Sequence, residues 1–343
     1  MEVFLVTHSL NGIPQKLHET ESLDLSYIER ELTKAGHNVL IMDHADFMAK
    51  RPEDISGRII WYASTQYPEY FQYVEDCLLY AQMCGGILVP NFSIFRCHEN
   101  KFFQELLKKN LGIDKPKAHL IGTLEDLNNS LPDLVFPLIL KSATGFGSAT
   151  VFKIDTSNEL VSKATSMLTN IIPPAANPIR RFKQKTEYEN KIAPYKGNYP
   201  LKSGRLVLQE FMPNLQHDWK ILVFGNNCFC LKRFVRENDF RASGSGNFDF
   251  KATPSHALLN YALGIATVLN SPWASLDIAE CEDGFGLIEF QCLHFGLYTL
   301  IGNDKCYEKV DSEWVEKKVI APVAEEYFCH AFLEHIEQFN KES

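Results

Sequence analysis

The sequence predicts a mixed α/β (α+β) protein with a parallel α/β domain first and two α+β subdomains after it, and three observations predict it. In residues 1–95, short apolar runs alternate with amphipathic segments, which is the pattern of parallel strands and covering helices. Residues 96–208 hold a clear helix and a glycine-rich strand–loop–strand. Residues 209–343 are dominated by strand-like runs joined by short turns, which favours an antiparallel sheet. We therefore expect three domains with these boundaries.

The composition excludes several classes of protein. The 343 residues are 45% hydrophobic and 22% charged, which is typical of a globular chain. The net charge of −9 gives no support to nucleic acid as a partner, and no run of about 18 apolar residues could cross a membrane. The first residues lack the basic start and cleavage site of a signal peptide. The nine cysteines show no C-x-x-C spacing and are typical of reduced thiols, so we expect a cytoplasmic protein.

The first domain is expected to be a parallel sheet with a ligand edge. Only Gly12 stands where a dinucleotide-binding fold needs G-x-G-x-x-G after its first strand, so NAD and FAD are not expected. Open α/β sheets bind ligands beyond the carboxyl ends of their strands. His8, Asn11 and Ser64 follow the first and third strands and are therefore candidates for the substrate side. The expected strands are 3–7, 39–42, 58–62 and 87–89, and the expected helices are 22–35 and 70–83.

The second domain contains a candidate phosphate-binding flap. A helix at 101–112 is followed by a strand at 137–142 that carries Lys141, a loop with Gly145, Gly147 and Ser148, and a returning strand at 149–154. Backbone N–H groups of such a loop can surround phosphates, and a lysine at its edge supplies a point charge. A glycine hairpin with a surface lysine is the alternative. The segment is not the G-x-x-x-x-G-K-[ST] loop of common nucleotide-binding proteins.

The segment between Asn177 and Arg205 is basic, with eight Lys or Arg against two Glu. Its prolines and glycines favour an exposed loop. The loop either closes over an anionic ligand or is a solvated insertion.

The third domain combines strands with a concentration of cations. Strands are expected at 206–212, 219–224 and 228–235, and helices at 257–269 and 319–339. Cations crowded near carboxylates are costly unless an anion lies between them. Arg236, Asn238 and Ser245 are further substrate-side candidates. The polar residues near the strand ends are Asp218, Lys220, Lys232, Arg233, Arg236, Asn238 and Arg241.

A hairpin at 275–296 carries the candidate metal ligands. Asp277 lies on its first strand, and Glu289 and Gln291 lie on its second. A three-residue loop centred on Asp283 would place Asp277 opposite Glu289, with Gln291 on the same face. Such hard oxygen ligands suit Mg²⁺. A two-residue turn of Asp283 and Gly284 would instead shift the register by one and leave a solvated hairpin with surface acids.

These motifs, in this order, resemble the ATP-grasp superfamily, closest to its branch of ribosomal-protein glutamate ligases and related carboxylate–amine ligases. The resemblance covers residues 100–296, and the twelve-residue spacing from Asp277 to Glu289 is typical of metal ligands in that branch. It implies an ATP-grasp fold in which two α+β subdomains clasp ATP. The motifs are Asn100-Lys101, PLILKSATGFGS, LVLQEFM, DWKILVFGNN, KRFVRENDFRASGSGNF and SLDIAECEDGFGLIEFQ.

The resemblance also implies an ATP site. The two lysines would contact phosphates, Glu210 and the backbone near Phe211 would face the adenine, and Asp218 would lie near the ribose. Lys220 stands where many relatives carry Arg beside that Asp. The implied ATP-binding residues are Lys101, Lys141, Gly145, Gly147, Ser148, Gln209, Glu210, Phe211, Asp218 and Lys220.

The implied catalytic residues are Arg233 and Arg241, which would neutralise the γ-phosphate and an acyl intermediate. Asp277, Glu289 and Gln291 would hold Mg²⁺, or Mn²⁺ in its place. Gln291 departs from the Asn usual in this branch; it keeps the amide oxygen on a longer side chain. His294, three residues later, is either a general base near the acceptor or a packed histidine.

The resemblance implies an ATP-dependent ligase that joins a carboxylate to an amine through an acyl phosphate. The substrates would be small molecules or peptides, and relatives are often homo-oligomers. Two alternatives stay open. One is a kinase on the same fold that phosphorylates a small molecule, and the other is a module that binds ATP without chemistry.

Overall fold

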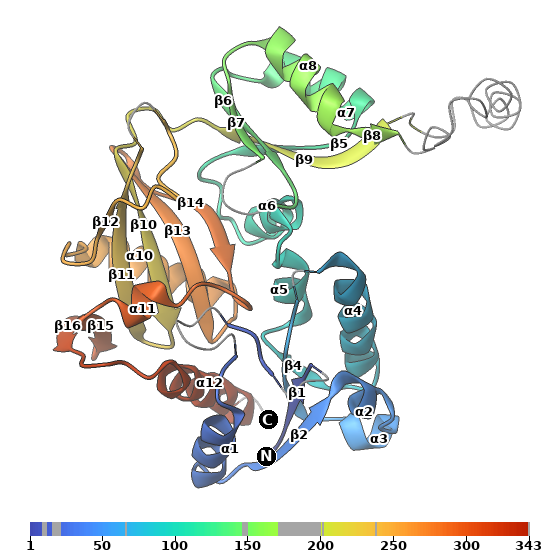
Figure 1. The fold of residues 1–343 in the computed structure, drawn as a ribbon, viewed down its shortest axis with the longest axis vertical. Coiled ribbons are helices and arrows are strands. Elements are labelled where there is room, and N and C mark those ends of the chain that lie inside the picture. The colour runs from blue at the N-terminus through green and yellow to red at the C-terminus, as the bar shows by residue number, and fades with distance from the viewer. Residues whose placement is uncertain are drawn as a thin grey trace, which may run out of the picture. The chain divides into compact units, whose positions relative to one another are not determined.

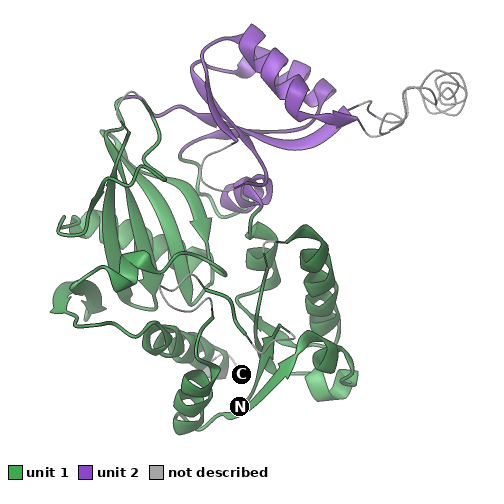
Figure 2. Cartoon of the chain, in the orientation of Figure 1, with its two compact units in different colours: residues 1–99, 110–115, 214–343 green, residues 100–109, 116–213 purple. Residues whose placement is uncertain are grey.

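A computed structural model describes residues 1–8, 12–15, 22–65, 67–145, 150–170, 200, 202–236 and 239–341. The chain forms two compact units, shown in Figure 2. Unit 1 comprises Met1–Glu99, Asn110–Lys115 and Asn214–Ser343, and unit 2 comprises Asn100–Lys109 and Pro116–Pro213. The expected mixed α/β class is confirmed, and the division into three domains stays a prediction. No helix among the described residues is long and apolar enough to span a bilayer.

Unit 1 begins with a parallel sheet, as the alternating pattern predicted, and its strand order is β2-β1-β3-β4. Figure 1 labels β1, β2 and β4 of this sheet. Asp24 caps the first helix by accepting from the backbone N–H groups of Ser26 and Tyr27, and Gly36, with φ of +86°, follows its end. Ile28 and Leu32 form the buried face of that helix. The elements are β1 (Glu2–Thr7), α1 (Leu25–Lys34), β2 (Asn38–Asp43), α2 (His44–Met48), α3 (Pro52–Ile55), β3 (Ile59–Tyr62), α4 (Pro68–Met83), β4 (Ile87–Val89) and α5 (Phe92–Cys97).

Unit 1 continues with an antiparallel sheet of order β14-β13-β10-β11-β15-β16, in which β12 pairs with β11. The β15–β16 hairpin was not expected from the sequence. The turn between β10 and β11 is shorter than predicted, because Phe224 pairs directly with Asn227. The elements are β10 (His217–Phe224), β11 (Asn227–Phe234), β12 (Phe248–Asp249), α10 (His256–Val268), β13 (Trp273–Cys281), β14 (Gly284–Gln291), α11 (Tyr298–Ile301), β15 (Lys305–Val310), β16 (Glu313–Lys318) and α12 (Ala324–Lys341).

One apolar core joins the two sheets of unit 1. Trp61 of β3 lies 5.0 Å from the ring centroid of Trp273 in β13, and also 5.0 Å from that of Phe332 in α12. All three side chains are buried in the same cluster. The backbone N–H of Asp24 also donates to Glu325 at 2.8 Å, which ties the start of α1 to α12. The first and last parts of the chain therefore stabilise each other.

Unit 2 is built on a second antiparallel sheet, of order β5-β9-β6-β7, with β8 paired to β9. Leucines and isoleucines from four strands and leucines from helices α7 and α8 fill its core. The strands around the glycine loop were expected, whereas β5, α7 and α8 were not. The elements are α6 (Lys101–Asn110), β5 (Ala118–Thr123), α7 (Leu124–Ser130), the 3-10 turn η1 (Leu131–Asp133), β6 (Leu138–Ser142), β7 (Val151–Ile154), α8 (Ser157–Met167), β8 (Thr169–Asn170) and β9 (Lys202–Glu210).

Replacing Phe332 by Ala is expected to lower the free energy of unfolding by about 3–5 kcal/mol, because it opens a cavity against Trp61. Urea unfolding measures the loss. The control is Met83→Ala: Met83 is 86% exposed and should change stability by no more than about 0.5 kcal/mol. Equal effects in the two variants would contradict a core shared by the ends of the chain.

His44, which follows β2, is expected to make the protein acid-sensitive. Burial and the neighbouring His8 lower the pKa of His44 to about 4, below its ordinary value of 6.5. Between these values the unfolded chain binds a proton that the folded protein does not, so stability falls as the pH drops below 6.5. At pH 5 this effect of His44 lowers the free energy of unfolding by about 2 kcal/mol. Urea midpoints at pH 7 and pH 5 should show a smaller acid loss in His44→Phe than in the parent; equal losses would exclude His44 as the cause.

Candidate active site

The β13–β14 hairpin sets the register of the predicted metal ligands. Asp277 pairs with Glu289 and Ser275 with Gln291, so all four side chains lie on one face of the sheet. The turn is not the expected three-residue loop, because Cys281 pairs with Gly284. A bulge beside Asp277 instead supplies the missing residue: Ile278 pairs with Leu287 while Asp277 pairs with Glu289. The expected pairing is present, and the expected loop is wrong.

Four charged side chains converge on the same face of the sheet. The Arg233 guanidinium donates to both oxygens of Asp218, at 2.7 and 2.8 Å, and to Oδ2 of Asp277 at 2.9 Å. Lys220 donates to Oδ1 of Asp277 at 3.2 Å and to Ser275 Oγ at 2.8 Å. Asp218 and Arg233 are only 3% exposed. Two cations and two carboxylates therefore form a neutral buried quartet.

The quartet determines the protonation state of the Asp277 carboxyl. Burial by itself would raise the pKa of this carboxyl, but Arg233 and Lys220 outweigh it and hold the pKa at about 2. Burial raises the pKa of Asp218, since its main partner is a single arginine shared with Asp277. Asp277 is therefore ionised at neutral pH, with one oxygen paired to Arg233 and the other to Lys220.

The donor set on this face fits Mg²⁺. Asp277 and Glu289 face each other across the hairpin, and the Gln291 amide lies one pair further along. No cluster of three His, Cys, Asp or Glu suited to a metal occurs among the described residues, and the Gln291 amide oxygen is the third oxygen donor on this face. Carboxylate and amide oxygens are the hard ligands that Mg²⁺ prefers.

His98 is a residue at this site that the sequence analysis missed. It is fully buried, and its Nδ1 lies 3.1 Å from Oε1 of Gln291. Burial lowers the pKa of His98 to about 4, so the ring is neutral and Nδ1 carries the proton donated to the amide oxygen. Nothing in the sequence connects positions 98 and 291. Only the tertiary structure brings them together.

In unit 2, the predicted ATP-binding lysines lie around the strand–loop of β6. Lys101 Nζ donates to the carbonyl oxygen of Gly145 at 2.8 Å, and its backbone N–H donates to Ala143 at the same distance. Lys141 is 7% exposed and donates to Oε1 of Gln209 at 2.5 Å. Both lysines are therefore held by groups of the same sheet and loop.

Two further residues of α6 extend this network and were also missed. Gln209 Nε2 donates to Oε1 of Glu105 at 3.1 Å, and Lys108 Nζ lies 3.0 Å from the same carboxylate. Lys108 is 1% exposed, and burial lowers its pKa. The Glu-x-x-Lys spacing in KFFQELLKKN is the only indication in the sequence. The network fixes the rotamer of Gln209 and, through it, the position of Lys141.

The predicted adenine-facing residues, Glu210 and Phe211, lie at the end of strand β9 in the same sheet. Glu210, the last residue of β9, receives a 3.4 Å hydrogen bond from the backbone N–H of Lys117. The Phe211 ring lies 5.2 Å from Lys153 Nζ.

The other candidates lie in two further places. Arg241 forms a bidentate pair with Asp239, at 3.0 and 2.7 Å, and Arg236 donates to the carbonyl oxygen of Gly244 at 2.7 Å. Ser245 accepts from the backbone N–H of Asn247 at 3.2 Å, in the same loop. His8 and Ser64 are joined by a 3.0 Å contact between Nε2 and the carbonyl oxygen. Asn11, Gly147, Ser148 and Asn238, and most of the basic segment, lie outside the described residues.

Comparisons with known proteins show the fold. No family model and no curated protein sequence matches the chain. Among solved structures, the D-cycloserine synthetase DcsG is similar with a TM-score of 0.57 and 10% identity, over 98% of this chain and 100% of that one. The D-alanine–D-alanine ligase of Bacillus anthracis follows with 0.51 and 12%, over 99% and 98%. The ATP-grasp ligase PsnB, complexed with a precursor variant, Mg and ADP, gives 0.50 and 14%, over 97% and 98%. The chain has the ATP-grasp fold.

Removing the central arginine of the quartet is expected to be strongly destabilising. Arg233→Met leaves two buried carboxylates without their shared partner, which costs about 3–5 kcal/mol in the free energy of unfolding. Arg241→Met is the matched control, because the more exposed Arg241–Asp239 pair is worth about 1 kcal/mol or less. Urea unfolding of both variants tests this. Similar small losses would show that the quartet does not stabilise the fold.

Proposed function

We propose that this protein is an ATP-dependent ligase that joins a carboxylate to an amine through an acyl phosphate and releases ADP and phosphate. One observation carries the proposal. Asp277 and Glu289 are paired across a hairpin, with the Gln291 amide beside them and Arg233 and Lys220 on the same face, in a chain with the ATP-grasp fold. Carboxylate ligands for Mg²⁺ together with an arginine and a lysine are groups that a reaction between two anions requires.

The metal has a defined role in this proposal. Asp277, Glu289 and Gln291 would hold Mg²⁺, or Mn²⁺ in its place, which neutralises charge on ATP phosphates and polarises the transferred phosphoryl group. The proton that His98 donates to Gln291 leaves the second lone pair of the amide oxygen available to a cation.

Lysine and arginine side chains would neutralise the negative phosphate charge that Mg²⁺ does not. Lys101 and Lys141 would bind phosphate oxygens, and the buried network behind Gln209 keeps Lys141 in one position. Arg233 is buried between two carboxylates, which raise its pKa and keep it ionised. We propose that it stabilises the phosphoryl group as the substrate carboxylate attacks. Arg241 would act later, on the acyl phosphate that the amine then displaces.

The location, the substrate class and the oligomeric state are the remaining parts of the proposal. All nine cysteines are free thiols, and a reaction that consumes ATP with reduced thiols fits a cytoplasmic enzyme. We propose small molecules or peptides as the carboxylate and amine substrates. Assembly as a homo-oligomer stays a prediction.

The test removes one residue from each unit. Lys141→Ala and Glu289→Ala are expected to lower ATP turnover by at least 100-fold, on the order of 3 kcal/mol in transition-state stabilisation. Lys34→Ala, an exposed lysine of α1, is the control and should retain full turnover. Turnover is measured with Mg²⁺ against pooled amino acids, short peptides and metabolite acids, with ADP, AMP and phosphate quantified.

The products separate the alternatives. ADP with free phosphate that depends on one pool supports the ligase. ADP with a lasting phosphorylated product indicates a kinase, AMP indicates adenylation, and bound but unconsumed ATP indicates a module without chemistry. Full activity of both variants would overturn the assignment of the site.

A further inference from the structure

The ammonium group of Lys220 lies among the residues that the proposed function assigns to the metal. Strands β10, β13 and β14 lie side by side (Figure 1). Lys220, on β10, donates to Oδ1 of Asp277 at 3.2 Å and to Oγ of Ser275 at 2.8 Å. On β14, Glu289 pairs with Asp277 and Gln291 pairs with Ser275. Directly paired side chains in an antiparallel sheet have Cβ atoms about 5 Å apart, so Lys220 holds its charge close to where a cation bound to Asp277 and Glu289 would lie.

Lys220 and a metal ion cannot share Oδ1 of Asp277 without repulsion. Mg²⁺ binds oxygen at about 2.1 Å. Added to the 3.2 Å contact of Lys220, this distance leaves the two cations no more than about 5 Å apart on that oxygen. Like charges this close repel, and they repel more strongly where the site is partly buried. The other oxygen of Asp277 is held by Arg233 at 2.9 Å, so a metal that binds Asp277 has to compete with one of the two side chains.

Lys220 is the side chain that can give way. Arg233 is 3% exposed and also donates to both oxygens of Asp218, at 2.7 and 2.8 Å, so moving it would leave a buried carboxylate without its partner. The Lys220 side chain is 13% exposed. Its second contact is the uncharged hydroxyl of Ser275, and its flexible stem lets the ammonium group turn to another acceptor.

The charges on this face favour such a displacement once a metal and an anion arrive together. The quartet is neutral, and Glu289 adds one negative charge beside it. A divalent cation next to Glu289 would therefore leave an excess of positive charge while Lys220 stayed in place. The phosphates of ATP are the anions that the proposed function brings to this face, and their oxygens accept hydrogen bonds from an ammonium group.

We propose that Lys220 and the divalent cation exchange places at Asp277. The ammonium group holds Oδ1 until the cation binds; the cation then displaces it, and it pairs with a phosphate oxygen of ATP. The proposal rests on the proposed function for the metal and the nucleotide. It follows that the protein alone binds the cation weakly, because each ion must first displace Lys220. Lys220 therefore couples the binding of metal and nucleotide, so that each ligand favours the other.

The first experiment measures Mn²⁺ binding without nucleotide, by the electron paramagnetic resonance of the free ion. Lys220→Met removes the ammonium group and keeps a stem of similar length, so it should bind Mn²⁺ at least about tenfold more tightly than the parent. Lys115→Met is the matched control: it breaks another Lys–Asp pair, with Asp283 at the turn of the same hairpin, and should bind as the parent does. Adding Glu289→Gln to Lys220→Met should remove the gain, which would assign the bound ion to this site.

The second experiment needs no variant and follows Lys220 itself in the parent protein. An amine-reactive reagent modifies the lysines, and mass spectrometry gives the rate at each position. Saturating Mn²⁺ should raise the rate at Lys220 severalfold, because the displaced ammonium group becomes accessible. Adding a non-hydrolysable ATP analogue together with Mn²⁺ should lower that rate again. Lys34, whose side chain is 63% exposed on α1, is the internal control and should react at one rate throughout.

A constant modification rate of Lys220 at saturating Mn²⁺ would overturn the exchange, as would a Lys220→Met variant that binds Mn²⁺ no more tightly than the parent. The lack of saturable Mn²⁺ binding in both proteins would overturn it together with the metal site. A rate at Lys220 that stays high with the nucleotide would overturn the pairing with phosphate. Exchange without ATP turnover in any substrate pool would instead contradict the ligase function and leave the exchange standing.

Discussion

The buried arrangement of Arg233 between Asp218 and Asp277 is the constraint on which the site depends. Arg233 and Lys220 keep Asp277 ionised in a place where burial alone would protonate it. Neither cation could reach Asp277 if its strand turned the other face to them. The register of β10 and β13, in which Lys220 pairs with Asp277, fixes that face, and the bulge between β13 and β14 brings Glu289 and Gln291 to the same face. The register of this sheet therefore determines which cations lie next to Asp277 and keep it ionised.

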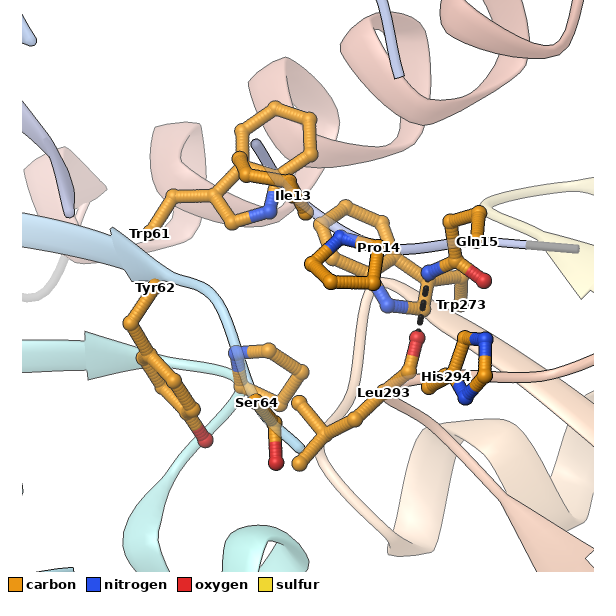
Figure 3. A pocket seen from close by; sticks show the side chains of 10 residues that line it. Ile13, Pro14, Gln15, Trp61, Tyr62, Ser64, Trp273, Leu293 and His294 are labelled. Atoms are coloured by element: carbon orange, nitrogen blue, oxygen red, sulfur yellow. Dashed lines mark hydrogen bonds between the residues drawn. The ribbon is translucent and has the colours of Figure 1, made fainter. Parts of the chain in front are cut away.

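A second constraint is the core that joins the two ends of the chain. Trp61, Trp273 and Phe332 belong to three elements that are far apart in sequence and lie in one cluster. Their packing holds the carboxyl edge of the parallel sheet against the face of β13. The same contact brings His98 to Gln291 and Ser64 to the neighbourhood of Leu293. The hydroxyls of Tyr62 and Ser64, which line a small pocket here (Figure 3), are buried without a hydrogen-bond partner among the described residues, which costs stability.

Unit 2 also contains a buried charged side chain, Lys141, whose charge is compensated by its neighbours. Lys141 is buried, and an isolated buried ammonium group is unfavourable. Gln209 accepts from it, Glu105 accepts from Gln209, and Lys108 balances the charge of Glu105. Each member of this chain has a partner, so the network adds rigidity rather than strain. A lysine held in this way loses little entropy when it meets an anion.

The sequence by itself determined many of the elements, although not β5, α7, α8 or the β15–β16 hairpin. Periodicity predicted the parallel strands, the two long helices of the first domain and several antiparallel strands, because each depends on neighbours within a few residues. The acids, lysines and arginines of the candidate site were named from motifs that resemble a known family, and their roles stay predictions. Only the tertiary structure decided how they pair. The bulge at Asp277, the contact of His98 with Gln291, the Glu105–Lys108 support and the pocket at Ser64 all come from residues distant in sequence. Packing and burial bring such residues together, and a local sequence pattern does not predict contacts between distant residues.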